Sequence, residues 1–301
     1  MKDALIGIIG GSGLGEALGA IGLGEAIQVD TPFGPPSAPI VRSEVQGVPV
    51  ALLARHGDGH LLNPSRVPYR ANIFALKSLG VTHVLASTAV GSLRESIAPG
   101  HLVIADQLID KTVERPRTFF DDLAVHVEFA APFCSSMRGQ LWAAAKSAST
   151  TVHSKGTYVC MEGPQFSTRA ECELHRSWGA DLIGMTALPE AKLAREAELC
   201  YALVALPTDY DCWKPHPAEV DKQALLQEII GNLQAATRHA VELIRAALPL
   251  IAAQALRPCA CQSALELAIW SDRKRISPDV RNRLGPLLAK YFPRVPSGST
   301  V

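Results

Sequence analysis

Apolar runs alternate along this chain with segments in which apolar residues recur every three or four positions. Short apolar runs bounded by turn residues are typical of buried strands, and the three-to-four-residue period is typical of amphipathic helices. The runs predict strands at Ala4–Ile9, Val50–Leu53, His83–Ala86, Leu102–Ala105, Thr157–Met161, Asp181–Gly184 and Cys200–Leu206. The periodic segments predict helices at Arg70–Leu79, Arg138–Ser147, Arg169–Trp178, Pro189–Ala197 and Asp221–Ala247.

This alternation indicates an α/β fold in which a single domain, residues 1–250, has a central mixed, largely parallel sheet flanked by helices. The composition changes after the long helix, which Pro258 prevents from continuing. Two more periodic segments, Ser263–Asp272 and Pro278–Tyr291, predict further helices. Residues 251–301 are therefore expected to form a helical C-terminal extension packed on the same domain.

Composition narrows the possible partners. The 301 residues are 48% hydrophobic, and 29 basic residues balance 29 acidic ones. Such a composition is globular, and its neutral balance gives no reason to expect a nucleic acid or a membrane surface as partner. Only Lys2 offers a positive charge ahead of the apolar start, so we predict no signal peptide and no transmembrane span. We expect a cytosolic protein.

Seven cysteines are present, and most stand singly in apolar segments, where reduced core thiols are the ordinary case. Cys259 and Cys261 are the exception, since they form a C-x-C pair. No second Cys or His pair at zinc spacing lies nearby in sequence, so no metal site is predicted. A disulfide between residues i and i+2 would be strained. Packing thiols are therefore favoured over a redox role.

Two carboxylates close the last predicted strand. The apolar run from Tyr201 to Leu206 leads into Pro-Thr-Asp-Tyr-Asp, which places Asp209 and Asp211 on either side of a tyrosine. Ligands of open α/β sheets bind at the carboxyl ends of strands, where one acid of a pair can stay protonated while the other stays ionised. That division suits a 6-aminopurine, whose N7 accepts and whose amino group donates. A solvated turn is the alternative interpretation.

Groups that bind anions or bases follow four other predicted strands. They are the loop Gly10-Gly-Ser-Gly13, the pair Arg55-His56, the run Ser87-Thr88-Ala89-Val90-Gly91 and the pair Met185-Thr186. Backbone N–H groups, hydroxyls and a guanidinium fork together suit a phosphate dianion. Phe166, after a fifth strand, offers an aromatic face to a base. Each group alone is ordinary turn or strand chemistry, but their convergence predicts a site for phosphate and a purine.

Other nucleotide-binding classes fit the first glycine loop less well. The run Gly11-Ser-Gly-Leu-Gly15 departs from the G-x-G-x-x-G pattern, and the Walker pattern is absent. An NAD-dependent oxidoreductase also needs an acidic residue near the end of its second strand, where this chain has Arg55 and His56. An NAD-dependent oxidoreductase remains an alternative, and binding of a dinucleotide would support it.

Longer blocks of sequence resemble the trimeric purine nucleoside phosphorylase family, in its branch that cleaves 5′-methylthioadenosine. The blocks are residues 7–14, 30–34, 52–57, 91–95, Glu162-Gly-Pro-Gln-Phe-Ser-Thr-Arg-Ala-Glu171 and Thr208-Asp-Tyr-Asp-Cys-Trp-Lys214. The likeness runs from about residue 5 to about residue 250. It implies phosphorolysis to adenine and 5-methylthioribose 1-phosphate in a homotrimer, with inorganic phosphate as co-substrate and no metal or organic cofactor.

The resemblance also implies a role for each matching residue. Phosphate is expected at Ser12, Arg55, His56, Thr88, Ala89 (through its amide) and Thr186. The nucleoside is expected at Phe166, Ser167, Met185, Leu225, Asp209 and Asp211, with His126 contributed by a neighbouring subunit. Asp209 and Asp211 are expected to act in catalysis, Asp209 as the acid that protonates N7 of the leaving purine.

The sequence departs from the family pattern near the ribose. Gly184 stands where asparagine is common, and Lys222 falls near a position that is usually apolar and faces the 5′-substituent. Lys222 or His216 can supply a partner for a 5′-hydroxyl, which keeps a broader adenosine phosphorylase as an alternative. A purine-binding protein without turnover is a third possibility.

Overall fold

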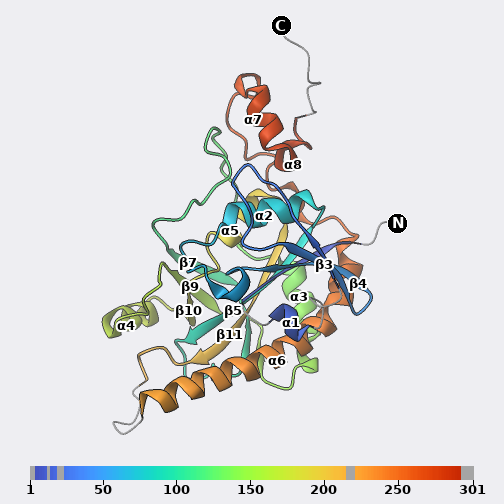
Figure 1. The fold of residues 1–301 in the computed structure, drawn as a ribbon. Helices are drawn as coiled ribbons and strands as arrows, with labels where there is room; N and C mark the ends of the chain where they lie inside the picture. The colour runs from blue at the N-terminus through green and yellow to red at the C-terminus, as the bar shows by residue number, and fades with distance from the viewer. Residues whose placement is uncertain (1–3, 12–13, 19–23, 215–220, 293–301) are drawn as a thin grey trace.

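A computed structural model describes residues 4–11, 14–18, 24–214 and 221–292, and over these residues the chain forms one eleven-stranded sheet with helices on both faces (Figure 1). The strands are β1 (Ile6–Gly10), β2 (Glu25–Ile27), β3 (Ile40–Val45), β4 (Val48–Ala54), β5 (His83–Ser92), β6 (Leu102–Ile104), β7 (Gln107–Lys111), β8 (Val152–His153), β9 (Thr157–Met161), β10 (Leu182–Gly184) and β11 (Cys200–Asp209). The α-helices are α1 (Leu14–Ala17), α2 (Tyr69–Ser78), α3 (Ser135–Ala143), α4 (Arg169–Ser177), α5 (Glu190–Glu196), α6 (Lys222–Ala255), α7 (Pro278–Arg283) and α8 (Gly285–Leu288). Short 3-10 helices are η1 (Asp58–His60), η2 (Ala145–Ser147), η3 (Ala260–Ser263) and η4 (Arg273–Arg275).

Strand β5 joins the two halves of the sheet. It pairs in parallel with β1 and β11, and its end pairs antiparallel with β10. The sheet continues from β1 through β4, β3 and β2, and from β10 through β9 and β7. Strand β11 also pairs with β6, which pairs with β8. Parallel pairs outnumber antiparallel ones, so the predicted mixed, largely parallel sheet is confirmed.

Two apolar cores lie on the two faces of this sheet. Helices α1 and α3 pack against α6 on one face, and α5 and α8 pack against α2 on the other (Figure 1). Strand β11 contributes side chains to both cores: Tyr201 and Leu203 belong to one, and Ala202 and Val204 belong to the other. Successive side chains of a strand point to opposite faces, so a strand covered on both sides is an unbroken apolar run.

The strands and helices predicted in residues 1–250 match observed ones within a few residues, with two main differences in length, whereas β2, β3, β7, β8 and α1 were not predicted. Strands β5 and β11 continue beyond their predicted ends, to Ser92 and Asp209. Helix α6 continues through Pro249 to Ala255, so the expected domain boundary at residue 250 falls inside a helix. Pro258 lies beyond the end of α6, as predicted.

One predicted helix of the C-terminal extension is wrong. Residues 263–272 form turns and a single antiparallel bridge from Ile269 to Val125. Beside this bridge the His126 N–H donates to the carbonyl of Ala268. These backbone groups find partners in a distant loop, which takes the place of the hydrogen bonds within a helix.

The second predicted helix of the extension, residues 278–291, is two short helices. Proline lacks an N–H and disrupts a continuing helix, and here Gly285 and Pro286 follow the end of α7. Leu284 and Leu287 pack into the same core as α2. No helix within the described ranges is both long enough and apolar enough to cross a membrane.

Candidate active site

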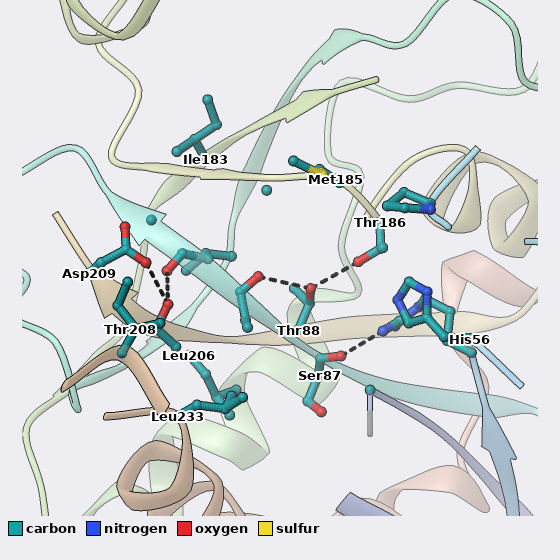
Figure 2. A pocket seen from close by; sticks show the side chains of 18 of the residues that line it. His56, Ser87, Thr88, Ile183, Met185, Thr186, Leu206, Thr208, Asp209 and Leu233 are labelled. Carbon is teal, nitrogen blue, oxygen red and sulfur yellow. Dashed lines mark hydrogen bonds between the residues drawn. The ribbon is translucent and has the colours of Figure 1, made fainter. Parts of the chain in front are cut away.

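A cavity of about 410 Å³ opens where β1, β4, β5 and β11 end and where the chain leaves β10 (Figure 2). Its lining includes nine of the predicted site residues, which are Arg55, His56, Thr88, Ala89, Phe166, Met185, Thr186, Asp209 and Asp211. Arg55 and Asp209, which the sequence places at the ends of two different strands, therefore line the same cavity. Residues from five strands reach one cavity because these strand ends lie on neighbouring positions of the same sheet.

Arg55 is buried beneath the cavity by a network that the sequence did not reveal. Its Nε and Nη2 donate to the two carboxylate oxygens of Glu190 at 2.8 and 2.9 Å, and its Nη1 donates to the carbonyl of Ser87 at 2.8 Å. The Tyr201 hydroxyl donates to the same carboxylate at 2.8 Å. Burial opposes the charge on Arg55, but Glu190 outweighs it and raises the pKa of Arg55 above its ordinary value. The guanidinium therefore stays charged.

His56 lies at the same end of the cavity and is neutral. Its Nδ1 lies 2.7 Å from the carbonyl oxygen of Leu62, and a carbonyl only accepts, so Nδ1 carries the proton and Nε2 is left as an acceptor. Burial lowers the pKa of His56 to about 4, with Arg55 and the stacked ring of His60 acting in the same direction. At neutral pH His56 can accept a hydrogen bond from a protonated phosphate oxygen.

Two threonine hydroxyls complete this polar end. The Oγ1 atoms of Thr88 and Thr186 lie 2.9 Å apart, and the Thr88 hydroxyl also lies 3.2 Å from the carbonyl oxygen of Ala89 (Figure 2). Both side chains are buried and line the cavity. One cation and two hydroxyls therefore face a single volume, which suits an anion with several acceptor oxygens.

The other end of the cavity carries the two aspartates. The register of β11 against β5 shifts between Pro207 and Asp209, and such a bulge re-aims the side chains that follow it. One oxygen of Asp209 accepts the N–H of Asp211 at 2.8 Å, and the other accepts the hydroxyl of Thr208 at 2.7 Å. Asp211 has a left-handed backbone, φ 50°, which Asp adopts more readily than most residues. The bulge and these hydrogen bonds hold the pair in place.

Two glycines keep space around the site. A Cβ at Gly91 would lie 3.2 Å from an oxygen of Asp209 and 3.2 Å from the Cβ of Asp211. A Cβ at Gly184 would lie 2.1 Å from the hydroxyl oxygen of Tyr158, which accepts the N–H of Thr186 at 3.4 Å. Tyr158 thus fills the space that a side chain at residue 184 needs, which explains why glycine departs here from the asparagine of the family pattern.

Helix α6 supplies a largely apolar wall of the cavity. Ile229, Leu233 and Thr237 line the cavity at intervals of four residues. Leu225 continues the same face one turn earlier, but it is not among the lining residues. Across the cavity Phe166 is 84% exposed, so the site of a single chain is open on that side.

Five further residues named in the sequence analysis either lie outside the cavity or fall outside the residues that the structure describes. Ser12, His216 and the side chain of Lys222 fall outside the described residues. The Ser167 hydroxyl lies 3.8 Å from the sulfur of Met161, a lining residue, but Ser167 itself does not line the cavity. His126 also stays away from it and packs edge-on against the Trp270 ring with centroids 4.8 Å apart.

Comparison with known proteins assigns this chain to one class. The profile of a family described as the Phosphorylase superfamily matches residues 5–249. The chain belongs to this superfamily.

The relatives of the chain narrow the class to one kind of phosphorylase. An S-methyl-5′-thioadenosine phosphorylase of Geobacter sulfurreducens is 47% identical over 96% of this chain and 99% of its own length. An S-methyl-5′-thioadenosine phosphorylase of Thermococcus kodakarensis is 47% identical over 87% of this chain and 97% of its own length.

Solved structures of the same kind are similar throughout the fold. A methylthioadenosine phosphorylase from an Antarctic soil metagenomic library has a TM-score of 0.86 and 46% identity, covering 95% of this chain and 100% of that one. The Schistosoma mansoni methylthioadenosine phosphorylase in complex with adenine has a TM-score of 0.81 and 36% identity, covering 89% of this chain and 100% of that one.

Proposed function

We propose that this protein cleaves 5′-methylthioadenosine with inorganic phosphate, giving adenine and 5-methylthioribose 1-phosphate. The observation that carries the proposal is one cavity with a buried cation and hydroxyls at one end and paired carboxylates at the other. Its relatives named as methylthioadenosine phosphorylases match nearly the whole chain. The reaction is a pentosyl transfer, so the protein is a glycosyltransferase.

The polar end holds phosphate for attack on C1′ of the ribose. Arg55 offers charged donors, Thr88 and Thr186 offer hydroxyls, and neutral His56 accepts the hydrogen of a hydrogen phosphate ion. A held phosphate lies in line with the bond that breaks, which removes much of the entropic cost of the encounter. Its charge also stabilises the positive charge that develops on the sugar.

The carboxylate end activates the purine as leaving group. Protonated Asp209 donates to N7 while the C1′–N9 bond breaks and the C1′–O bond to phosphate forms. Over one turnover adenine gains the proton that hydrogen phosphate loses, so the reaction balances without an oxidant or a reductant. Ionised Asp211 accepts from the 6-amino group, an arrangement that a 6-oxopurine cannot satisfy because it presents an acceptor there.

The wall from α6 favours a methylthio group over a hydroxyl. Ile229 and Leu233 present apolar surface to the cavity beside Leu206. A 5′-hydroxyl would lose its hydrogen bonds to water against such a surface, whereas a methylthio group gains by burial. We therefore expect methylthioadenosine to be preferred over adenosine.

The proposal extends to assembly and compartment. The cavity is open beside Phe166, and we propose that a homotrimer closes it with His126 of a neighbouring subunit, as the family resemblance implies. We also propose that the enzyme acts in the cytosol, where its seven free thiols would stay reduced.

Release of free adenine tests the proposed reaction directly. Purified protein is incubated with 5′-methylthioadenosine in the presence and absence of phosphate, and adenine is separated by chromatography. We expect release that requires phosphate, with kcat/KM higher for methylthioadenosine than for adenosine and far higher than for inosine. Adenine release without phosphate would make the protein a hydrolase, and binding without release would make it a purine-binding protein. Faster cleavage of inosine would overturn the reading of the carboxylate pair.

A further inference from the structure

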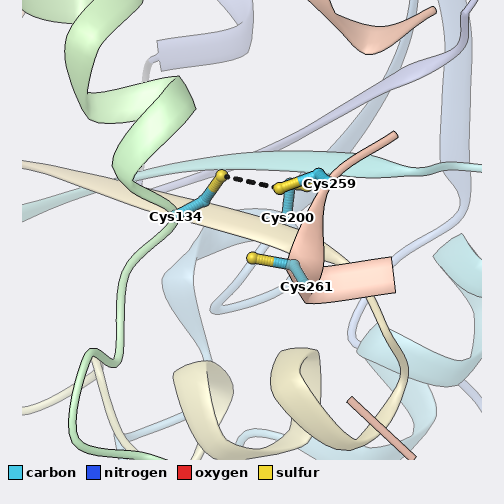
Figure 3. A group of neighbouring side chains, drawn as sticks. All are labelled: Cys134, Cys200, Cys259 and Cys261. Carbon is cyan, nitrogen blue, oxygen red and sulfur yellow. Dashed lines mark hydrogen bonds between the residues drawn. The ribbon is translucent and has the colours of Figure 1, made fainter. Parts of the chain in front are cut away.

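Four cysteines from three distant parts of the chain meet at one point (Figure 3), and none of them lines the cavity. Cys134 precedes α3, Cys200 begins β11, and Cys259 and Cys261 follow α6. Their sulfur atoms all lie within 4.8 Å of one another, and the side chains point toward a common centre. The fold thus supplies the second pair of thiols that the C-x-C segment lacked in sequence.

The spacing of the sulfurs fits a shared ligand. The sulfurs of Cys134 and Cys259 are 3.7 Å apart. Four thiolates placed tetrahedrally around an ion, each at about 2.3 Å, lie about 3.8 Å from one another. A disulfide would bring two sulfurs to about 2.0 Å. Because four sulfurs share one neighbourhood, the arrangement matches a four-ligand site better than one or two separate bonds.

Cys134 stands at the start of a helix. It is the N-cap of α3, where the helix dipole favours negative charge. A thiolate is the form that binds metal.

We propose that Cys134, Cys200, Cys259 and Cys261 form a structural site for a single thiophilic divalent cation of the zinc class. Soft sulfur ligands select such ions over magnesium or calcium, and four thiolates leave no open position for substrate. Each thiol loses its proton as the ion binds. The site plays no part in phosphorolysis, since none of the four cysteines lines the cavity. Cys200 and Asp209 stand at opposite ends of β11, nine residue steps or roughly 30 Å apart.

The proposed ion would attach the segment that follows α6 to the rest of the domain. Cys259 and Cys261 come from that segment, whereas the other two ligands come from the start of β11 and the start of α3. The segment continues to Ile269, which bridges to Val125. Metal binding to the folded chain alone would raise its stability by mass action.

Cobalt serves as the test probe, because tetrahedral thiolate coordination gives Co²⁺ intense visible and near-ultraviolet absorption. The full-length protein is purified with a phosphine reductant, stripped with a chelator and titrated with Co²⁺ without oxygen. We expect these bands to saturate at one Co²⁺ per chain and to vanish when Zn²⁺ is added. We also expect the stripped protein to have a lower Tm than the zinc-loaded protein.

Variants locate the site. Cys259 is only partly buried, so Cys259→Ser is the least disruptive change, and it should weaken Co²⁺ binding and shift the absorption. The double variant Cys259→Ser/Cys261→Ser should abolish both Co²⁺ binding and the absorption bands. Cys160→Ala is the matched control, since Cys160 is a buried thiol outside the cluster, and it should bind Co²⁺ as the unchanged protein does.

Two results would overturn the proposal. In the first, all four thiols of the unchanged protein react with a thiol reagent and no cobalt bands form, which leaves ordinary packing thiols. In the second, mass spectrometry of protein purified without reductant finds two hydrogens fewer for each linked pair, which makes the cluster a disulfide site. Neither result bears on adenine release, so the proposed function is tested separately.

Discussion

Asp209 accepts hydrogen bonds from the hydroxyl of Thr208 and from the backbone N–H of Asp211. Both favour the ionised carboxylate, whereas the proposed reaction needs Asp209 protonated. A bound purine would reverse this balance, because it removes water from the carboxylate and places N7 within reach of a shared proton. The state that donates the proton thus belongs to the complex with substrate.

The variant Asp209→Asn tests whether Asp209 is the acid, because asparagine has nearly the same shape as aspartate. The amide can still donate a hydrogen bond to N7 but cannot transfer a proton, so kcat should fall by roughly 10²–10⁴-fold. The KM for phosphate should stay close to its original value, since phosphate lies at the other end of the cavity. Glu95→Gln is the control, because Glu95 is an exposed acid that does not line the cavity. A variant with undiminished kcat would remove Asp209 from this role.

Glu190 is the positioning residue for Arg55. Replacing it with Gln leaves a buried guanidinium without its counter-charge, and breaking such a pair costs roughly 3–5 kcal/mol. We expect Glu190→Gln to lower the free energy of unfolding measured in urea and to raise the KM for phosphate. Tyr201→Phe removes only one hydrogen bond from the same network and should cost roughly 1.5–3 kcal/mol. Equal stability of both variants and the parent would show that Arg55 is held in another way.

At the scale of elements, the sheet was largely predictable from sequence, and parts of the site were not. Strand β11 is a long apolar run that ends in carboxylates, and both properties are local. The contact between Tyr158 and Gly184 joins neighbouring strands whose pairing the sequence does not encode locally. For the same reason the turns at residues 263–272 were mistaken for a helix, since their partner is a loop far away in sequence.

Helix α6 shows why a cavity wall is hard to find in sequence. The apolar face of an amphipathic helix is predicted as core along its whole length. Which turn reaches a cavity depends on how the helix crosses the sheet, and here the contact begins at Ile229, one turn after Leu225. The family resemblance names Leu225, whereas the residues of α6 that line the cavity are Ile229, Leu233 and Thr237.

Leu233→Asn tests that wall. The amide disfavours a buried methylthio group and offers a partner to a 5′-hydroxyl, so relative kcat/KM should move toward adenosine by roughly 10–200-fold, the range for small groups in apolar pockets. Steady-state rates with both nucleosides give the ratio. Ile230→Asn is the control, because Ile230 is partly exposed on the same helix and does not line the cavity. An unchanged ratio in Leu233→Asn would place the 5′-group elsewhere.

At the scale of the whole molecule, the proposed trimer predicts complementation between two damaged chains. His126→Ala should lower activity, and Asp209→Ala should nearly abolish it. If each site takes His126 from a neighbour, a mixed assembly of both variants restores intact sites, about a quarter of the total for random equal mixing. Activity after co-refolding measures the recovery, and ultracentrifugation reports the oligomer. Activity no greater than the mean of the two variants would mean that sites are not shared.

The bridge between Val125 and Ile269 links the loop that holds His126 to the C-terminal part of the chain. In the proposed trimer, damage near Ile269 would displace His126, which follows Val125 directly, and so disturb the site of a neighbouring copy. A truncated chain would keep its own contacts to purine and phosphate, yet it would impair a full-length neighbour. In a cell that produces both forms, the truncated form would act as a dominant inhibitor.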